Sequence, residues 1–499
     1  MPVEIRRSED IVALENKMRQ LAGSDDAPKR AADLPVPELL SHFHNDHGNA
    51  CRLIALHGQD LRFCHPLKKW LVWDGKRWAV DETEQARRLA KETMVEFLHQ
   101  AVSNRAGDKV EKFASASLDS RRIASMLSMA QPEIFVSPSD LDTNPYLLNF
   151  ADGTVDLRSG VLSPHDRRNF ITKLVPHRFV PNAKCPQWLT FLGKIMGGGV
   201  QGEASERASR LIEYLQTAFG YSLTGCTIEK AVFVLFGSGN NGKSTLLSTF
   251  RQLVEEYSML LQVDTLMVRQ ESNNTQADLA DLRGARFVQT SETEEGQRLA
   301  QGKLKRITQG MGKIKATRKY ENPIEFSETH KLWMDTNRKP TIRDAQDQAT
   351  FNRLHAIPFL VRIPPEEIDR ELPRKLLLEA EGILAWAVVG ARRWHEIGLI
   401  KPKEVAAAGT KWQSDMDQIG RFILERCATG PSFGCLSSQV YAAYKYWAEQ
   451  EGEEVLSQKT FGSKLLDRDG FTSAHSNSGT QYFGIGVRKN PSSESEINA

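Results

Sequence analysis

The chain has 499 residues, which is more than one hydrophobic core supports, so two to four domains are expected. Apolar residues make up 40% of the chain and charged residues 26%, and the sequence contains no run of 18 apolar residues, which excludes a helical membrane span. The net charge of +2 excludes a protein that is basic over its whole surface, so any affinity for nucleic acid must come from local clusters.

The N-terminal sequence has no apolar segment after its first basic residues, and this pattern predicts that no signal peptide is present. The six cysteines are scattered without a CxxC pair, which is typical of reduced thiols. We therefore expect a soluble, cytoplasmic protein with no membrane partner.

The first 200 residues divide into a polar segment and a mixed module. Residues 1–45 are charged and polar and predict a short helix followed by a linker. Helical periodicity over 84–102 and two Asp-Gly hairpin patterns, at 70–80 and 147–157, follow it. Together these patterns predict an α+β module over residues 46–200.

The segment 201–400 opens with a helix, an apolar strand, a glycine-rich loop and a second helix, an order that predicts an α/β fold with a parallel sheet. Glycines in such a loop let backbone N–H groups turn toward phosphates at a helix N-terminus. Lys243 is then placed to reach the β- and γ-phosphates, and Ser244 to bind Mg²⁺. A glycine turn without a ligand is the alternative, and the flanking strand and helix argue against it. The residues predicted to contact ATP are Gly237, Ser238, Gly239, Asn240, Asn241, Gly242, Lys243, Ser244 and Thr245.

A second apolar strand, residues 284–291, is followed directly by acidic residues. ATP hydrolysis needs a carboxylate at such a position, either to hold Mg²⁺ or to polarise the attacking water. Glu292 is the first candidate and is also a predicted Mg²⁺ ligand, and Glu294 is the second candidate. A solvated acidic loop is the alternative, but the glycine-rich loop upstream favours catalysis.

Two further apolar strands each border one polar candidate. The first strand ends at Asn337, whose amide can hold the attacking water against the γ-phosphate, although an Asn that only caps a loop is the alternative. Arg353 precedes the other strand and can neutralise transition-state charge in the ATP site of a neighbouring subunit. Arg338 and Arg343 are rivals for this role, and a surface ion pair is the alternative interpretation of Arg353.

Residues 302–319 contain seven basic residues and no acidic residue. Such a cluster can neutralise phosphates independently of sequence, and Tyr320 beside it offers a ring for base stacking. A solvated charged face is the alternative.

The C-terminal segment, residues 408–489, shows two helical patterns and then a short hairpin, as in a winged helix. Gln458, Lys459 and Lys464 on the second helix are candidates for DNA contact, but a winged helix binds protein equally well. Residues 490–499 are polar and are predicted to be disordered.

Four motifs, GSGNNGKS, SETEEG, TNRKP and RLHAIPF, together resemble the superfamily 3 helicases, and among them the phage and plasmid primase-helicase proteins related to the poxvirus primase-helicase. The resemblance extends upstream to GNACRL at 48–53, to 70–78 and to 147–156. It implies an AAA+-like P-loop ATPase over 201–400, preceded by a helicase-associated domain and followed by a winged-helix domain. It also implies a hexameric ring that translocates on single-stranded DNA in the bacterial host of a mobile element.

The resemblance further assigns individual residues. It implies that the basic cluster forms a pore hairpin, which points to Lys313, Lys315, Arg318 and Lys319 as DNA contacts. Family members often have two arginines where this chain has Asn352-Arg353, so Arg353 is the finger candidate at this point.

Fewer than about 50 residues precede the family-like region, less than a typical domain, so we expect no primer synthesis by this chain and a separate primase or replication initiator as a partner. Two other functions remain open at this point. One is an origin-binding or helicase-loading protein that uses ATP only as a switch, and the other is a P-loop enzyme of another class, such as a kinase.

Three other residue groups fit structural roles better than chemical ones. The histidines and cysteines between residues 42 and 65 match no standard zinc spacing. Asp140 and Asp142 superficially resemble a polymerase metal pair but lack the further acids that such a site needs. The three tryptophans between residues 70 and 78 are typical of a core.

Overall fold

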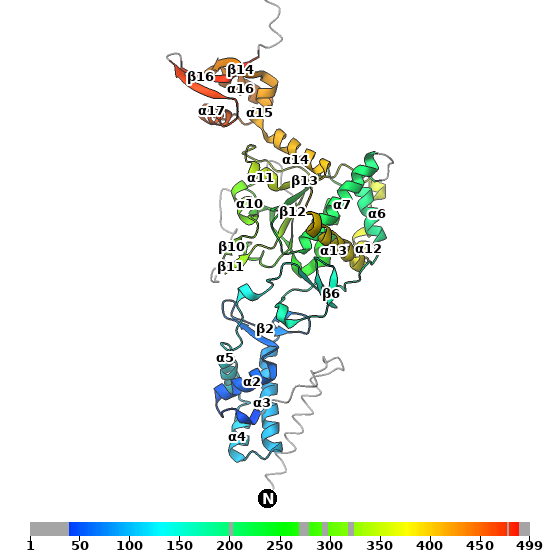
Figure 1. The fold of residues 1–499 in the computed structure, drawn as a ribbon, viewed down its shortest axis with the longest axis vertical. Coiled ribbons are helices and arrows are strands. Elements are labelled where there is room, and N and C mark those ends of the chain that lie inside the picture. Colours follow the sequence, from blue (N-terminus) through cyan, green and yellow to red (C-terminus); the bar gives the residue numbers. More distant parts are fainter. Residues whose placement is uncertain are drawn as a thin grey trace, which may run out of the picture. The chain divides into compact units, whose positions relative to one another are not determined.

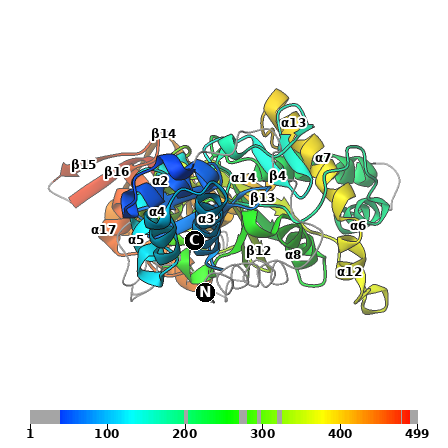
Figure 2. The ribbon, with the colours of Figure 1, turned by 90° about the horizontal axis from the view of Figure 1, so that it is seen from below.

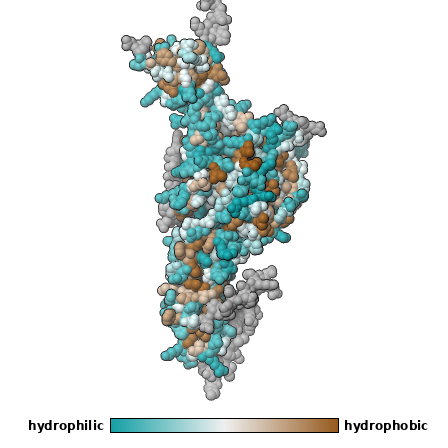
Figure 3. Space-filling model, in the orientation of Figure 1, coloured by the Kyte–Doolittle hydropathy of each residue, from teal (hydrophilic) through white to brown (hydrophobic). Residues whose placement is uncertain are grey.

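The computed structural model describes residues 39–198, 203–268, 279–291, 298–317, 324–476 and 479–488. The chain divides into two compact units, with the boundary between Leu141 and Asp142. Among the described residues, no helix combines the length and the apolar content needed to cross a bilayer. On the face shown in Figure 3, hydrophobic residues are interspersed with hydrophilic ones.

The first unit is a small α+β module around one core. Its antiparallel sheet has the order β1-β2-β3, and its helices pack around a core that includes Leu53, Phe97 and Met126. The predicted hairpin at 70–80 and the predicted helix at 84–102 are confirmed. Its elements are η1 (Leu39–Ser41), α2 (Asp46–His57), β1 (Leu61–Cys64), β2 (Lys69–Trp73), β3 (Trp78–Val80), α3 (Gln85–Ser103), α4 (Asp108–Ala116), α5 (Ser120–Ala130) and η2 (Pro138–Asp140).

The second unit opens with a small sheet that joins a larger core. Its three strands pair antiparallel in the order β4-β5-β6, which confirms the hairpin predicted at 147–157. Leu148, Phe150 and Val155 of this sheet lie in the same hydrophobic cluster as helices further along the chain. The unit therefore contains residues on both sides of position 200. These first elements are β4 (Leu147–Phe150), β5 (Gly153–Asp156), β6 (Val161–Ser163), η3 (Arg167–Asn169), α6 (Pro186–Met196) and α7 (Glu203–Leu223).

The centre of the second unit is a five-stranded sheet with the order β13-β7-β12-β9-β8, and every pairing in it is parallel. This confirms the predicted α/β class with a parallel sheet. The β12 and β13 strands are buried along their whole length, as expected of a parallel sheet covered on both faces. The strands and the elements between them are β7 (Val232–Phe236), α8 (Lys243–Val254), η4 (Glu255–Tyr257), β8 (Ser258–Leu260), η5 (Val263–Thr265), β9 (Phe287–Ser291), α10 (Gln301–Ile307), β10 (Lys313–Ala316), β11 (Ile324–Ser327), β12 (Lys331–Thr336), α11 (Gln348–Arg353) and β13 (Leu354–Pro358).

Alternate residues of the central strands enter two different cores, because successive side chains of a strand point to opposite faces of the sheet. Phe233 and Trp333 face a core formed with α6, α7, α8 and α13, whereas Val232 and Met334 face a core that includes α10. Helices α7 and α13 pack side by side on the first face (Figure 1, Figure 2). The helices that follow the sheet are η6 (Pro365–Glu367), α12 (Leu372–Leu377), α13 (Ala380–Ile397) and α14 (Lys403–Met416).

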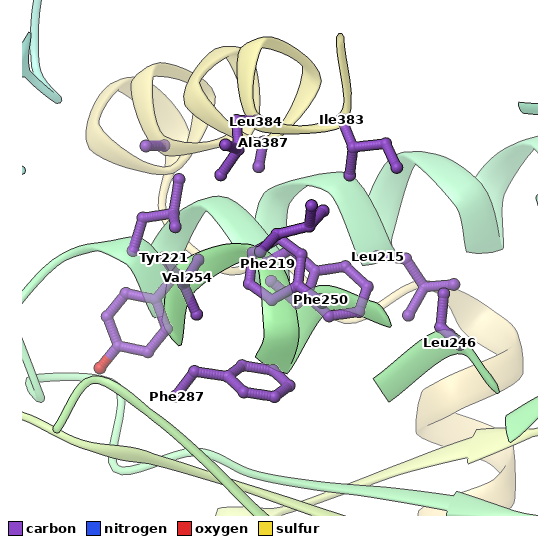
Figure 4. Packing of buried hydrophobic residues seen from close by; sticks show 14 of the residues in the cluster. Leu215, Phe219, Tyr221, Leu246, Phe250, Val254, Phe287, Ile383, Leu384 and Ala387 are labelled. Atoms are coloured by element: carbon purple, nitrogen blue, oxygen red, sulfur yellow. The ribbon is translucent and has the colours of Figure 1, made fainter. Parts of the chain in front are cut away.

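Aromatic rings fill the space between the sheet and the first helical layer. Phe219 of α7 stacks on Trp333 with ring centroids 4.5 Å apart, and Phe233 stacks on the same Trp at 4.2 Å. Phe219, Phe250 and Phe287 converge beneath α13 (Figure 4). Buried aromatic pairs of this kind contribute about 1 kcal/mol each beyond the area that they bury.

Residues 418–487 form three helices and an antiparallel sheet of order β14-β16-β15, with a core of their own. The two predicted helices and the predicted C-terminal hairpin are present, whereas the β14 strand has no counterpart in the sequence-based prediction. The elements are α15 (Gln418–Arg426), β14 (Cys427–Leu436), α16 (Ser437–Gln450), α17 (Gln458–Leu466), β15 (Thr472–Ser476) and β16 (Gly479–Val487).

Candidate functional site at the glycine-rich loop

The glycine-rich loop, residues 237–242, lies at the carboxyl edge of the parallel sheet. It leaves β7 after Phe236, which pairs with Thr336 of β12 on one side and with Pro358 of β13 on the other. The β13 strand lies on the side of β7 opposite to β12, β9 and β8. Ligands of open α/β sheets bind at such a switch point, outside the carboxyl ends of the strands. The 12-residue α8 begins directly after the loop, and the positive end of its dipole favours an anion there.

Two glycines are required by the shape of this loop. Gly237 (φ 153°) approaches the Phe359 carbonyl so closely that an added Cβ would lie 2.1 Å from its oxygen. Gly242 has a φ of 83°, and its Cβ would lie 2.6 Å from Cγ2 of Ile195 in α6. A Cβ added at Gly239 would lie within 4 Å of no other atom, so close packing does not explain this glycine. The loop is therefore fixed between β13 and α6 at its two ends.

Lys243 connects the loop to the next strand of the sheet. Its side chain is 4% exposed. The ammonium group donates hydrogen bonds to the Gly237 carbonyl at 2.7 Å, to Oδ1 of Asn241 at 2.9 Å and to Oδ1 of Asn337 at 3.3 Å. The structure thus brings Lys243 and Asn337 together, although 94 residues separate them in the chain.

Ser244, the first residue after Lys243, donates a hydrogen bond to an acid that sequence reasoning missed. Its Oγ lies 2.6 Å from Oδ2 of Asp335 on β12. Asp335 is 5% exposed, and its other oxygen, Oδ1, has no hydrogen-bond partner among the described residues. The signal in the sequence is an acid inside an apolar strand, two residues before Asn337, because a carboxylate buried there needs a specific partner.

The two predicted acids, Glu292 and Glu294, lie outside the described residues. The last described residue before them, Ser291 at the end of β9, pairs with Asp335. Among the described residues, no group of three or more metal-binding side chains gathers at one point. The roles assigned to Glu292 and Glu294 stay predictions.

The side chain of Arg353 binds to backbone carbonyl groups outside the glycine-rich loop. It is the last residue of α11, and its guanidinium donates to the Thr308 carbonyl at 3.3 Å and to the Ala349 carbonyl at 2.5 Å. The guanidinium of Arg353 thus binds to α11 and to the end of α10 rather than to the glycine-rich loop. Of its rivals, Arg343 accepts a hydrogen bond at its carbonyl from Lys464, and Arg338 accepts one at its carbonyl from Thr336.

A buried acid lies beside this arginine. Glu328 is 4% exposed and accepts hydrogen bonds from the backbone N–H groups of Gln309 and Gly310. Burial raises the pKa of Glu328 to about 7, and the two N–H donors and the charges of Lys331 and Arg353 lower that rise. Glu328 therefore changes charge near neutral pH.

The basic cluster forms part of a two-stranded hairpin. Lys313 and Lys315 lie on the exposed face of β10, while Ile314 and Ala316 are buried on the other face. The paired strand β11 brings Glu325 to 3.4 Å from the ammonium group of Lys313, so the local charge is less one-sided than the sequence of 302–319 predicts. Arg318, Lys319 and Tyr320 lie outside the described residues, and their contact with DNA stays a prediction.

Candidate DNA contacts on the C-terminal helix α17 differ in their surroundings. Gln458 and Lys459 are exposed. Lys464 donates to the Arg343 carbonyl at 3.2 Å. Two of the three side chains are therefore exposed, and the third is engaged with the chain itself.

Three family models match consecutive parts of the chain. A model described as D5 N terminal like matches residues 50–197, a model of a family of unknown function matches 235–353, and a model described as poxvirus D5 protein-like matches 414–483. The second match contains the glycine-rich loop, Asp335, Asn337 and Arg353. The three matches thus cover most of the first unit, most of the central sheet and the C-terminal helices.

Two viral relatives carry helicase names. "Putative helicase L207/L206" of Acanthamoeba polyphaga mimivirus is 25% identical over an alignment of 392 residues, which covers 71% of this chain. "Putative helicase 022R" of Frog virus 3 is 23% identical over an alignment of 393 residues, which covers 63% of this chain. The chain spans only 40% of the length of each of these relatives.

The fold has a counterpart among solved structures. The apo A form of the NrS-1 C-terminal region superimposes with a TM-score of 0.50 at 10% identity, covering 87% of this chain and 98% of that one. At this identity the likeness speaks for the fold alone. The D5 models that match on either side of the central sheet and the helicase-named viral relatives make this chain similar to the D5-like primase-helicases.

Proposed function

We propose that the chain is an ATP-hydrolysing DNA helicase of replication, of the superfamily 3 type, with the glycine-rich loop as its P-loop. The observation that carries the proposal is the convergence of Lys243 and Ser244, at the start of α8, on Asn337 and Asp335 at the end of β12. A strand, a glycine-rich loop and a helix in this order form an anion site. A polar amide and a carboxylate beside that site are what hydrolysis needs in addition.

In this proposal, residues 237–245 bind the phosphates of ATP. Lys243 is buried and already directed at the loop, so it exchanges its contacts with Gly237, Asn241 and Asn337 for phosphate oxygens. Asn337 is then released to hold the attacking water, and Glu292 or Glu294 accepts the proton of that water. Arg353 acts in the ATP site of a neighbouring subunit, which fits its position away from the loop of its own chain.

The residues around Ser244 fit a bound Mg²⁺. The hydroxyl of Ser244 gives its hydrogen to Asp335, so its lone pairs are left for a cation, and Oδ1 of Asp335 is a buried acceptor without a partner among the described residues. Ser244 and Glu292 are the proposed ligands. When bound, Mg²⁺ neutralises negative charge on the β- and γ-phosphates.

The DNA contacts are proposed on the hairpin β10–β11 and on the C-terminal domain. Lys313 and Lys315 share one exposed strand face, as a track for a phosphate backbone requires, with Arg318, Lys319 and Tyr320 as further contacts. We propose residues 201–400 as the ATPase domain, 46–200 as the helicase-associated domain and 408–489 as a winged helix, whose sheet and helices have suitable topology.

The assembly in this proposal is a homohexameric ring on single-stranded or forked DNA, in the cytoplasm of the bacterial host of a phage or plasmid. A separate primase or replication initiator is the proposed partner, and the chain itself synthesises no primers. A primer-extension assay that yields oligonucleotides from this protein alone would contradict the last point.

Strand displacement on a forked DNA duplex tests the helicase proposal against an ATP switch. The wild-type protein with ATP and Mg²⁺ should separate the strands, and the double variant Lys313→Ala/Lys315→Ala should lose most of this activity while it keeps its ATPase activity without DNA. Lys109→Ala/Lys112→Ala, which removes two exposed lysines of α4, is the matched control. DNA-stimulated ATP hydrolysis without strand separation by the wild type would favour an origin-binding or helicase-loading protein.

A further inference from the structure

Asp335 is a carboxylate buried inside a strand of the central parallel sheet. It lies on β12, one of the fully buried strands, and is itself 5% exposed. One oxygen accepts from Ser244 at 2.6 Å, and the other has no hydrogen-bond partner among the described residues. A buried polar atom without a partner costs on the order of 1–3 kcal/mol, so such an atom indicates a bound water, an ion or a catalytic role.

The direction of the Ser244 hydrogen bond determines whether its hydroxyl can still donate or only accept. An ionised carboxylate only accepts hydrogen bonds, so the hydroxyl must donate its single hydrogen to Asp335. The short distance is typical of a hydrogen bond to a charged acceptor. Both lone pairs of Ser244 then receive no hydrogen bond from the described residues, and the bond to Asp335 fixes their orientation.

The sheet places Asp335 between the loop strand and the acid strand. Asp335 pairs with Leu235 of β7 on one side and with Ser291 of β9 on the other. Neighbouring strands lie about 4.8 Å apart. The carboxylate is therefore one strand away from the glycine-rich loop and one strand away from the residue that precedes Glu292.

We propose that Asp335 supports magnesium binding at Ser244 from outside the coordination sphere of the ion. Its Oδ2 orients the Ser244 hydroxyl as a ligand, and its Oδ1 accepts a hydrogen bond from a water molecule on the cation. Mg²⁺ keeps several of its waters in nucleotide sites, and groups that hold the ligands and waters tune its affinity. This proposal rests on the proposed function, because it needs a nucleotide at the loop.

Titration of the protein with ADP, in excess Mg²⁺ and again in EDTA, tests this role without any turnover. The quantity of interest is the dissociation constant for ADP in EDTA divided by that in Mg²⁺. This ratio reports how much the metal strengthens nucleotide binding. Asp335→Asn should lower this ratio at least about tenfold. Affinity in EDTA should stay equal or improve, because the variant removes a negative charge beside the phosphates. Asp166→Asn removes a half-buried acid paired with Arg168, in a part of the chain away from the loop sequence, and should leave the ratio unchanged.

Two further measurements separate a metal role from a structural one. Ser244→Ala should also lower the ratio, and adding Asp335→Asn to it should lower the ratio little further, because both changes act on one ligand. Without nucleotide, Asp335→Asn should melt at the wild-type temperature or above. A wild-type ratio in Asp335→Asn, or a large drop in its melting temperature, would overturn the proposal and assign the acid to folding.

If the proposed function itself were wrong, the binding measurements would give a different result. In that case neither the wild type nor the Lys243→Ala variant would bind ADP in either solution, and the metal role would fall with the nucleotide site. Wild-type binding that depends on Lys243, together with an unchanged ratio in Asp335→Asn, removes the metal role of Asp335 alone.

Discussion

Glu328 should make the stability of the second unit depend on pH. Its carboxyl is buried and has a pKa of about 7, against an ordinary value of 4.5. Below pH 4.5 the group is protonated in both states. As the pH rises toward 7, the unfolded chain releases the proton while the folded chain keeps it, so stability falls. Above about pH 7 the folded chain also releases the proton, and the loss becomes constant.

The size of this effect follows from the shift. A shift of roughly 2.5 pH units corresponds to about 3 kcal/mol. Of this, about 2.5 kcal/mol falls between pH 5 and pH 8. Glu328→Gln retains an acceptor for Gln309 and Gly310 but cannot ionise. It should therefore be close to wild type at pH 5 and more stable at pH 8.

Urea unfolding at both pH values, followed by tryptophan fluorescence, measures this difference. Trp333 is fully buried two residues after Lys331 and reports on the same strand. Glu325→Gln on the exposed face of β11 is the matched control and should shift the unfolding free energy by less than about 0.5 kcal/mol at either pH. An equal effect of Glu328→Gln at pH 5 and pH 8 would refute the reasoning.

Three further changes test the core, the loop and the finger. Lys331→Met removes a buried amino group that donates to the Thr224, Cys226 and Thr329 carbonyls. It should lower the free energy of unfolding, measured by urea titration, by about 3 kcal/mol. An unchanged free energy would show that those carbonyls find other partners. Gly242→Ala should lower the melting temperature clearly more than Gly239→Ala, because only the first adds a Cβ that overlaps its neighbours, and equal melting temperatures would contradict this. Arg353→Ala should reduce kcat at least about 10³-fold and leave ADP binding intact. Mixing it with Lys243→Ala should restore part of the hydrolysis if the arginine acts across subunits, and no recovery would place its action within one chain.

The local pattern of the sequence predicts the centre of this fold well. An apolar strand, a glycine-rich loop and a helix are neighbours in the chain, so their order alone indicates the loop and the position of Lys243. Asn337 was also predicted beside the loop. Its contact with Lys243 follows because parallel strands present their carboxyl ends at one edge.

Features that depend on long-range pairing could not be predicted in the same way. The insertion of β12 between β7 and β9 is set by packing of whole strands, and it is this order that places Asp335 against Ser244. Glu325 comes to face Lys313 only because β11 folds back on β10. The contact of Gly242 with α6 joins segments that the sequence divides between two domains.

The central claim is that Lys243 holds a nucleotide whose hydrolysis drives the protein. The most direct test is the rate of phosphate release from ATP by the purified wild type, with Mg²⁺ and single-stranded DNA, beside that of Lys243→Ala. The wild type should hydrolyse ATP, and the variant should lose this activity while it keeps the wild-type circular dichroism spectrum. Absence of hydrolysis in the wild type, or an undiminished rate in Lys243→Ala, would contradict the claim.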